Sequence, residues 1–233
     1  MAWTVLRRDF VDGKVECRLG VKRHFIRTGT AYVIENEHGE IAFCGPTCAK
    51  NAEYVTNPNE TVPDLTSKLI LDELTQAKGK GGGSGRRQDP IKKEIQNNKN
   101  SELYLEVLYK LVPLLNLAAN TIDDGLNHLI SLILKGDSQE SIRKNFRHIL
   151  LDVIVSTKGS RYELKYLLFM YAYLKQIDFL FKRKNCNESE RDFLQSCQMY
   201  VMRHHLVSEK QFVHINRKLQ VFGRSIHFIG MEN

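Results

Sequence analysis

Four residues with soft ligand atoms lie close together near the N-terminus of this 233-residue chain. They are Cys17, His24, Cys44 and Cys48, and together they span 32 residues. Thiolate sulfur and imidazole nitrogen are side-chain ligands that Zn²⁺ accepts in tetrahedral protein sites. A segment of this size buries too little apolar surface to fold securely alone, so a bound ion would supply much of its stability. The cluster therefore predicts a structural zinc site with these four ligands.

The residues between the second and third of these ligands predict a β-hairpin. Residues 30–35 (TAYVIE) and 40–43 (EIAF) are rich in β-branched and aromatic side chains, which favour strands. Gly39, between them, can adopt the positive φ that a tight turn needs. The hairpin would end at Cys44, and a short helix is predicted directly after it, with Cys48 in its first turn. Both sulfurs could then reach one ion.

The sequence FCGPTC at residues 43–48 resembles the F-C-x3-C second half of the FCS, MYM and TRASH-like treble-clef zinc fingers. Nineteen residues separate His24 from Cys44, which is similar to the spacing in that family. The first half departs from the family's pattern, because six residues separate Cys17 from His24 where those fingers have a C-x2-C knuckle. The resemblance implies a zinc site and a binding role, with protein or nucleic acid as the partner.

Basic residues outnumber acidic residues, and the surplus is unevenly distributed. The chain has 34 Lys and Arg against 27 Asp and Glu, which gives a formal charge of +7 and a pI near 9.1. Residues 1–60 are balanced, whereas residues 78–99 hold seven basic and two acidic residues. A basic chain favours nucleic acid, an anionic membrane surface or an acidic protein as its partner.

Two groups of basic side chains are the candidate nucleic-acid-binding residues. The first surrounds Phe25 and Tyr32, where cations could hold phosphates and a ring could stack on a base. The second lies in and beside a glycine-rich stretch, where it could contact phosphate backbones without sequence preference. The ten residues are Arg18, Lys22, Arg23, Arg27, Lys78, Lys80, Arg86, Arg87, Lys92 and Lys93. An ordinary solvated charged surface is the alternative interpretation of the first group.

The glycine-rich stretch marks a boundary between two parts of the chain. Five of the seven residues 79–85 are glycine, a composition that cannot hold a regular element. The stretch lacks the G-x4-G-K-[ST] order of a P-loop, so a flexible tether is predicted. We expect a zinc-binding hairpin module at 1–60, a short helix and flexible basic linker at 61–99, and a helical bundle domain at 100–233.

From residue 101 onward the apolar residues follow helical periodicity. Helices are predicted at 101–112, at 122–134, from Asp137 to about 154, at 162–181, and after the capping residues Asn187 and Ser208. The segment 162–181 is apolar nearly all round, which predicts the central helix of a bundle. The expected fold class is therefore α+β: a small treble-clef-like zinc module, a flexible linker, and an all-α bundle of five or six helices.

No motif in the sequence identifies a reaction. The nucleophile elbow, the H-E-x-x-H pair, the deaminase zinc motif and paired catalytic carboxylates are all missing from it. The N-terminal residues lack the apolar core of a signal peptide, and no run of eighteen apolar residues occurs. We therefore expect no membrane association and a cytoplasmic or nuclear location.

The leading functional hypothesis is a non-enzymatic, nucleic-acid-associated protein. The zinc module and basic linker would contact DNA or RNA, and the helical domain would bind a protein partner or a second copy. One alternative is a protein–protein adaptor or regulator of a larger machine, including one of viral origin. An enzyme of unfamiliar type, with a polar pocket in the helical domain, is the third.

Overall fold

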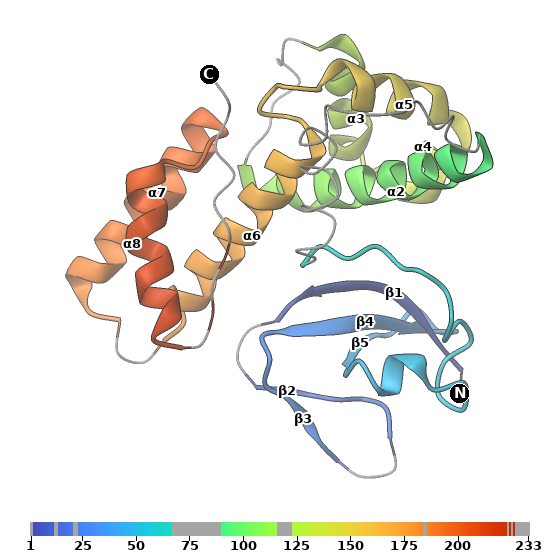
Figure 1. The fold of residues 1–233 in the computed structure, drawn as a ribbon, viewed down its shortest axis with the longest axis horizontal. Coiled ribbons are helices and arrows are strands. Elements are labelled where there is room, and N and C mark those ends of the chain that lie inside the picture. The colour runs from blue at the N-terminus through green and yellow to red at the C-terminus, as the bar shows by residue number, and fades with distance from the viewer. Residues whose placement is uncertain are drawn as a thin grey trace, which may run out of the picture. The chain divides into compact units, whose positions relative to one another are not determined.

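The computed structural model describes residues 2–11, 14–20, 23–66, 90–115, 123–183, 186–222, 224 and 226, with the backbone alone for 90–99. The chain divides into two compact units, Met1–Lys68 and Leu69–Asn233. The first unit is built from strands and the second from helices (Figure 1). The α+β layout predicted from the sequence is therefore confirmed. The predicted tether at 79–85 lies outside the described residues.

The N-terminal unit is built on an antiparallel sheet with the strand order β1-β4-β5. The strands are β1 (Trp3–Phe10), β4 (Thr30–Asn36) and β5 (Ile41–Cys44), followed by the short 3-10 helix η1 (Cys48–Lys50). The predicted hairpin is confirmed as β4–β5. Its turn is held by Asn36, whose side-chain oxygen accepts from the backbone N–H groups of His38 and Glu40, while Gly39 has φ +77°. A second, two-stranded sheet joins β2 (Val15–Glu16) to β3 (Phe25–Ile26).

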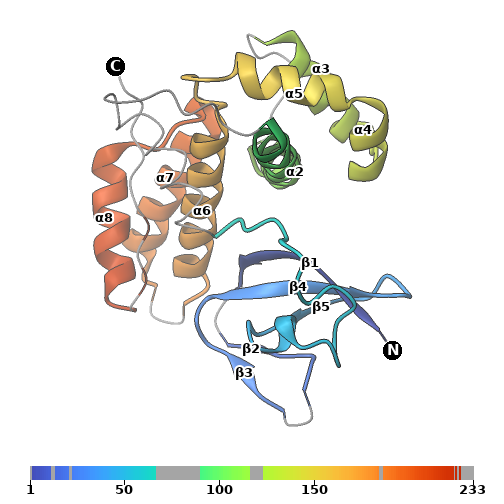
Figure 2. The same ribbon diagram turned by 45° about the vertical axis from the view of Figure 1, so that its right-hand side comes forward.

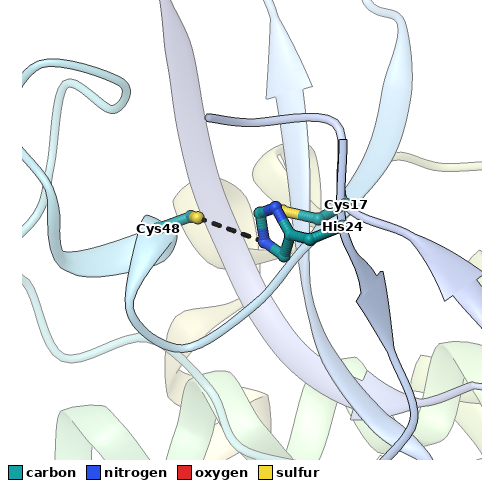
Figure 3. Close-up of side chains that lie close together, drawn as sticks. All are labelled: Cys17, His24 and Cys48. Atoms are coloured by element: carbon teal, nitrogen blue, oxygen red, sulfur yellow. Dashed lines mark hydrogen bonds between the residues drawn. The ribbon is translucent and has the colours of Figure 1, made fainter. Parts of the chain in front are cut away.

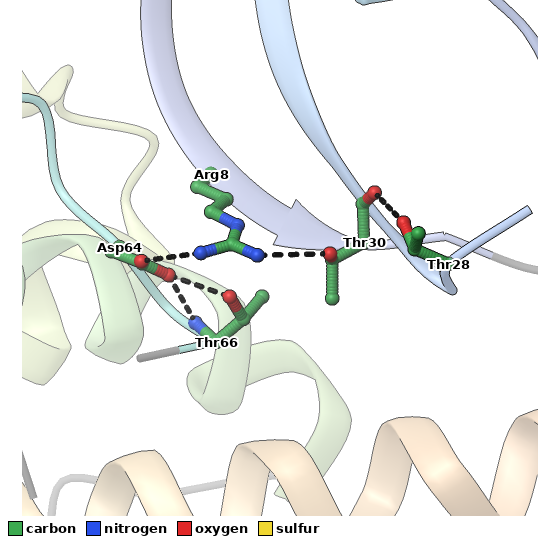
Figure 4. Close-up of polar contacts among 5 residues, drawn as sticks. All are labelled: Arg8, Thr28, Thr30, Asp64 and Thr66. Atoms are coloured by element: carbon green, nitrogen blue, oxygen red, sulfur yellow. Dashed lines mark hydrogen bonds and ion pairs between the residues drawn. The ribbon is translucent and has the colours of Figure 1, made fainter. Parts of the chain in front are cut away.

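The segment after η1 closes the free edge of β1. It runs parallel to β1, with bridges from Trp3 to Val55 and from Arg8 to Asp64. Between these bridges the side-chain amide of Asn57 hydrogen-bonds to the β1 backbone. It accepts from the N–H of Val5 and donates to the Val5 carbonyl. The Arg8 guanidinium ties this segment to the sheet through Asp64 and Thr30 (Figure 4). Residues 61–66, assigned to the linker from sequence, thus lie along β1.

The described part of the C-terminal unit contains seven helices, more than the predicted five or six. They are α2 (Pro90–Leu115), α3 (Asp124–Leu134), α4 (Gln139–Asn145), α5 (Arg147–Ser156), α6 (Leu164–Phe181), α7 (Glu188–His204) and α8 (Glu209–Gln220). The prediction that 162–181 forms the central helix is confirmed, because α6 is buried on nearly all sides. It packs against α2, α7 and α8, whereas α3, α4 and α5 gather around α2 (Figure 2).

Three details of the predicted helices were wrong. The helix expected from Asp137 to about 154 is split at Phe146, whose ring lies edge-on to His128 at 5.4 Å between centroids. Its N-cap is Ser138, one residue later than expected, and that hydroxyl accepts from the N–H of Ser141. The helix expected at 101–112 begins at Pro90 and passes through Pro113.

Candidate metal centre

A small hairpin brings the first two predicted ligands together. In the β2–β3 pair, Glu16 lies opposite Phe25. The next pair along the hairpin is Cys17 and His24, and the Cys17 N–H donates to the His24 carbonyl at 2.9 Å. This cross-strand pair places the two candidate ligands side by side.

Three of the four predicted ligands converge on one point (Figure 3). The ligand atoms of Cys17, His24 and Cys48 all lie within 4.8 Å of one another. The Cys48 sulfur lies 3.6 Å from Nε2 of His24. Two ligands of a tetrahedral zinc ion with bonds of 2.0–2.3 Å are separated by roughly 3.5 Å, so these side chains need little movement to hold an ion. The sequence prediction is thus confirmed for a cluster of three residues that could bind a metal.

Cys44 lies beside this cluster but is not one of the three converging residues. It ends β5 opposite Tyr32 and is fully buried. Burial, and then the nearness of Cys17 and Cys48, raises the pKa of the Cys44 thiol to about 12. Burial and Cys17 likewise raise the pKa of Cys48 to about 11. The thiols of Cys44 and Cys48 are therefore disfavoured as thiolates, and a bound divalent cation would favour the thiolate forms instead.

Backbone groups fix the orientation of the sulfurs. The N–H of Gly45 donates to the Cys17 sulfur at 3.4 Å, and the Cys17 and Cys48 thiols both point to the Leu19 carbonyl. Gly20, the next residue, has φ +107°, and a Cβ there would lie 3.3 Å from Cε1 of His24 and 3.9 Å from the Cys48 sulfur. Glycine at this position thus lets the loop approach the cluster closely.

The two sides of the β2–β3 hairpin differ in chemistry. Side chains alternate along a strand, so the cluster's Cys17 and His24 fall on the inner side with Val15 and Ile26. The side chains on the other side, here called the outer side, are all exposed. They are Lys14, Glu16, Arg18, Arg23, Phe25 and Arg27. The outer side therefore carries four cations, one carboxylate and one aromatic ring.

Two of the outer-side cations have acidic neighbours. The Arg23 guanidinium forms a two-point ion pair with Glu16, and this interaction holds the pKa of Glu16 below its ordinary value. Arg18 lies 3.6 Å from Glu40, with both side chains about half exposed. Lys14 instead lies over the Phe25 ring, 3.7 Å from its centroid. Lys14 was missed as a candidate because only the pairing of β2 with β3 places it beside Phe25.

The remaining predicted nucleic-acid-binding residues have no described side chains. Lys22, Lys78, Lys80, Arg86 and Arg87 lie outside the described residues. Lys92 and Lys93 belong to the first turns of α2, where only the backbone is described. Their predicted role remains a prediction. Tyr32, considered beside Phe25, is half-buried against the core of the N-terminal unit.

The helical unit contains a cavity of about 230 Å³ between the ends of α6, α7 and α8. Leu180, Leu194 and Phe222 supply much of its apolar lining. Its charged groups already have partners within the chain: Lys218 pairs with Glu190, and Arg183 lies 3.3 Å from the centroid of the Phe222 ring. The cavity is therefore mixed in character and has no cluster of polar groups free to act on a substrate.

Comparison with known proteins finds no match to this chain. No family model, no curated protein and no solved structure is similar to it. None of the helices in the described ranges has the length and apolar character needed to span a membrane. Function is therefore inferred from the residues of this chain.

Proposed function

We propose that this chain is a non-enzymatic nucleic-acid-binding protein whose N-terminal unit is held together by a zinc ion. The two-sided β2–β3 hairpin is the observation that carries the proposal. Its inner side directs Cys17 and His24 toward Cys48, and its outer side presents four exposed cations and an exposed ring, with Lys14 over that ring. A metal on one side would thus fix the shape of a basic surface on the other.

The donor set favours zinc. Two sulfurs and an imidazole suit Zn²⁺ better than Mg²⁺ or Ca²⁺, which take oxygen ligands. Structural zinc sites have four protein ligands, and Cys44 is the only other cysteine in this unit. Cys44 ends β5 four residues before Cys48, and its thiol is near enough to Cys17 and Cys48 for both to raise its pKa. We therefore assign Cys17, His24, Cys44 and Cys48 as the ligands, as the resemblance to treble-clef fingers implies.

The outer side favours phosphate as the partner group. Four cations are present there with one carboxylate, and fully exposed ion pairs such as Arg23 with Glu16 contribute little to stability. Such weak pairs leave the cations able to bind phosphate, which releases counterions and makes binding dependent on salt. In this proposal the lysines and arginines at 78–93 add sequence-independent contacts.

Metal analysis of the purified full chain tests the zinc assignment. We expect one zinc per chain, lost on Cys48→Ser and retained on Cys186→Ser, a half-buried thiol of the helical unit. Replacement of the zinc by Co²⁺ should give the absorption of a tetrahedral site with thiolate ligands. A chain purified without any transition metal, and unable to bind zinc afterwards, would contradict the assignment.

Salt titration of oligonucleotide binding tests the proposed nucleic-acid-binding function. Binding by the full chain should weaken steeply as salt rises, with a slope proportional to the number of phosphates contacted. The double variant Lys14→Ala/Arg27→Ala should reduce that slope by roughly 1.4–1.8, because two contacts are lost. The control Lys135→Ala/Lys144→Ala removes two exposed lysines of the helical unit and should bind like the wild type. Absence of binding at low salt would overturn the proposal in favour of the protein adaptor.

A further inference from the structure

We infer that the outer side of the β2–β3 hairpin binds single-stranded nucleic acid, with Phe25 stacked on a base and the surrounding cations on the flanking phosphates. This inference rests on the proposed function, because it specifies the form of nucleic acid that the chain binds. It concerns the hairpin alone and makes no claim about the basic residues at 78–93.

Phe25 is exposed in a place where its ring has no structural role. It belongs to the two-residue strand β3, and 41% of its surface is accessible. Its strand neighbour Ile26 is buried and supplies the apolar contact that holds this strand to the core. Tyr32 is half-buried against the same core, so its ring is not free for a ligand. Phe25 is therefore the aromatic side chain that can take a base.

The contact between Lys14 and Phe25 can give way to a base. An exposed cation–π contact contributes about 0.5–1 kcal/mol, whereas stacking of a base on an aromatic side chain contributes about 1–3 kcal/mol. The base would therefore displace the lysine from the ring. The Lys14 ammonium, on its flexible four-carbon stem, would move to a phosphate next to the stacked nucleotide. The hairpin thus offers one position where a base can stack, and Lys14 beside it can bind the neighbouring phosphate.

The composition of the outer side favours a single strand over a duplex. The arginines of the outer side can bind phosphates of either form, and arginine can also match guanine edges in a duplex groove, so the cations do not separate the two forms. The exposed Phe25 ring is the group that does. A ring can stack on a base only when the base's face is uncovered, and in a duplex both faces are covered by neighbouring bases. DNA and RNA strands share the required chemistry.

Binding of the full chain to oligothymidine, oligouridine and a duplex of equal length tests this inference. Phe25→Ala should weaken binding to the single strands by about 5- to 150-fold, and binding to the duplex should change little. The matched control is Ile41→Ala, an exposed apolar residue that belongs to β5 and not to the β2–β3 hairpin. Its affinity should equal that of the wild type. Unchanged zinc content in both variants shows that the unit remains folded.

Two further variants separate stacking from a general loss of structure. In Phe25→Trp, stacking should quench the new tryptophan when oligothymidine is added, while the buried Trp3 contributes a constant background. Glu16→Gln should tighten binding by a few fold, because it removes the carboxylate that pairs with Arg23. A damaged hairpin would not bind more tightly.

The outcomes distinguish the inference from the proposed function. If the chain binds duplex and single strands equally, and Phe25→Ala has no effect on either, the stacking inference is wrong while nucleic-acid binding stands. If no nucleic acid binds at low salt, the proposed function fails as well. A preference for single strands that disappears in Phe25→Ala and persists in Ile41→Ala supports the inference.

Discussion

The N-terminal unit and the helical unit are stabilised by different kinds of interaction. The helical unit has a large continuous core, and its central helix α6 is buried on nearly all sides. The N-terminal unit has a smaller core, and β2 and β3, which are flanked by Cys17 and His24, have two residues each. Strands this short add little stability by themselves. The difference teaches where the proposed zinc ion would matter: apolar burial accounts for the helical unit, and the ion would add to the smaller core of the N-terminal unit.

Removal of the metal should have the largest effect and should separate the two units. Structural zinc contributes about 10–16 kcal/mol of apparent folding free energy, comparable with the entire stability of a small domain. We expect a chelator, or Cys17→Ser, to unfold the N-terminal unit alone. The single tryptophan, Trp3, is buried in that unit, so its fluorescence should shift to the red. The helical circular dichroism signal should persist.

Two results would contradict the view that the metal stabilises the N-terminal unit and apolar burial stabilises the helical unit. Unchanged Trp3 emission after complete loss of zinc would show that packing suffices to fold the N-terminal unit. Simultaneous loss of the helical signal would show that the two units depend on each other. Cys197→Ser alters a buried thiol of the helical unit and should leave both zinc content and Trp3 emission unchanged.

A substitution that leaves a cavity in the helical core should destabilise the helical unit and leave the N-terminal unit folded. Leu167 on α6 is fully buried, and Leu167→Ala should cost about 2–5 kcal/mol. In a unit of this size that lowers the melting temperature of the helical signal by about 4–20 °C. Zinc content and Trp3 emission at low temperature should stay the same. Leu134→Ala on α3, where 59% of the leucine is exposed, is the control and should change stability by less than about 0.5 kcal/mol.

Gly20→Ala tests how closely the loop must approach the metal cluster. The new Cβ would meet His24 at 3.3 Å, and the residue would keep a φ of +107° that alanine rarely adopts. Such strain costs about 1–3 kcal/mol, which should appear as weaker zinc binding in a competition titration. Gly136→Ala is the control, because Gly136 has φ +87° with nothing within 4 Å of the added Cβ. It should strain the helical unit but leave zinc affinity unchanged.

Local patterns predicted much of the fold. Strand composition and Gly39 located the β4–β5 hairpin, and the all-round apolar segment identified α6. Asn187 was also correctly predicted as an N-cap, since its side chain accepts from the N–H of Glu190. These features depend on residues close in sequence. The break at Phe146 was not predicted, because it involves a ring contact with His128 on another helix.

The candidate site was predicted in its residues but not in its geometry. The spacing of Cys17 and His24 matched no zinc knuckle, and only the pairing of two very short strands explains how they meet. The roles of Gly20 and Lys14 were missed for the same reason. Gly20 lies near His24 and Cys48, and Lys14 lies over Phe25, only because the β2–β3 hairpin and η1 bring these residues together. Sequence spacing proposed Cys44 as a ligand, but the structure places it beside the three converging residues and not among them, buried at the end of β5.

The smallest expected effect concerns acid stability of the helical unit. His205 ends α7 in a left-handed conformation, and the Tyr162 hydroxyl lies 3.0 Å from its Nδ1. Burial, followed by the charges of Arg161 and His204, lowers the pKa of His205. The folded unit therefore favours the neutral ring, whose Nδ1 can accept a hydrogen bond from the Tyr162 hydroxyl. Stability from this group is present above the unfolded-state pKa of about 6.5 and is lost as the pH falls below it.

His205→Asn should flatten this dependence, because asparagine tolerates the left-handed conformation and does not titrate. When the pH is lowered from about 7.5 to about 5.5, the melting temperature of the helical signal should fall further in the wild type than in the variant. The two decreases should differ by at most about 2–4 °C. His148→Asn, at an exposed position on α5, is the matched control and should behave like the wild type. Trp3 emission should also respond to acid in all three proteins, because zinc ligands take up protons. Equal pH dependence in all three helical transitions would show that His205 does not contribute to the acid response of the helical unit.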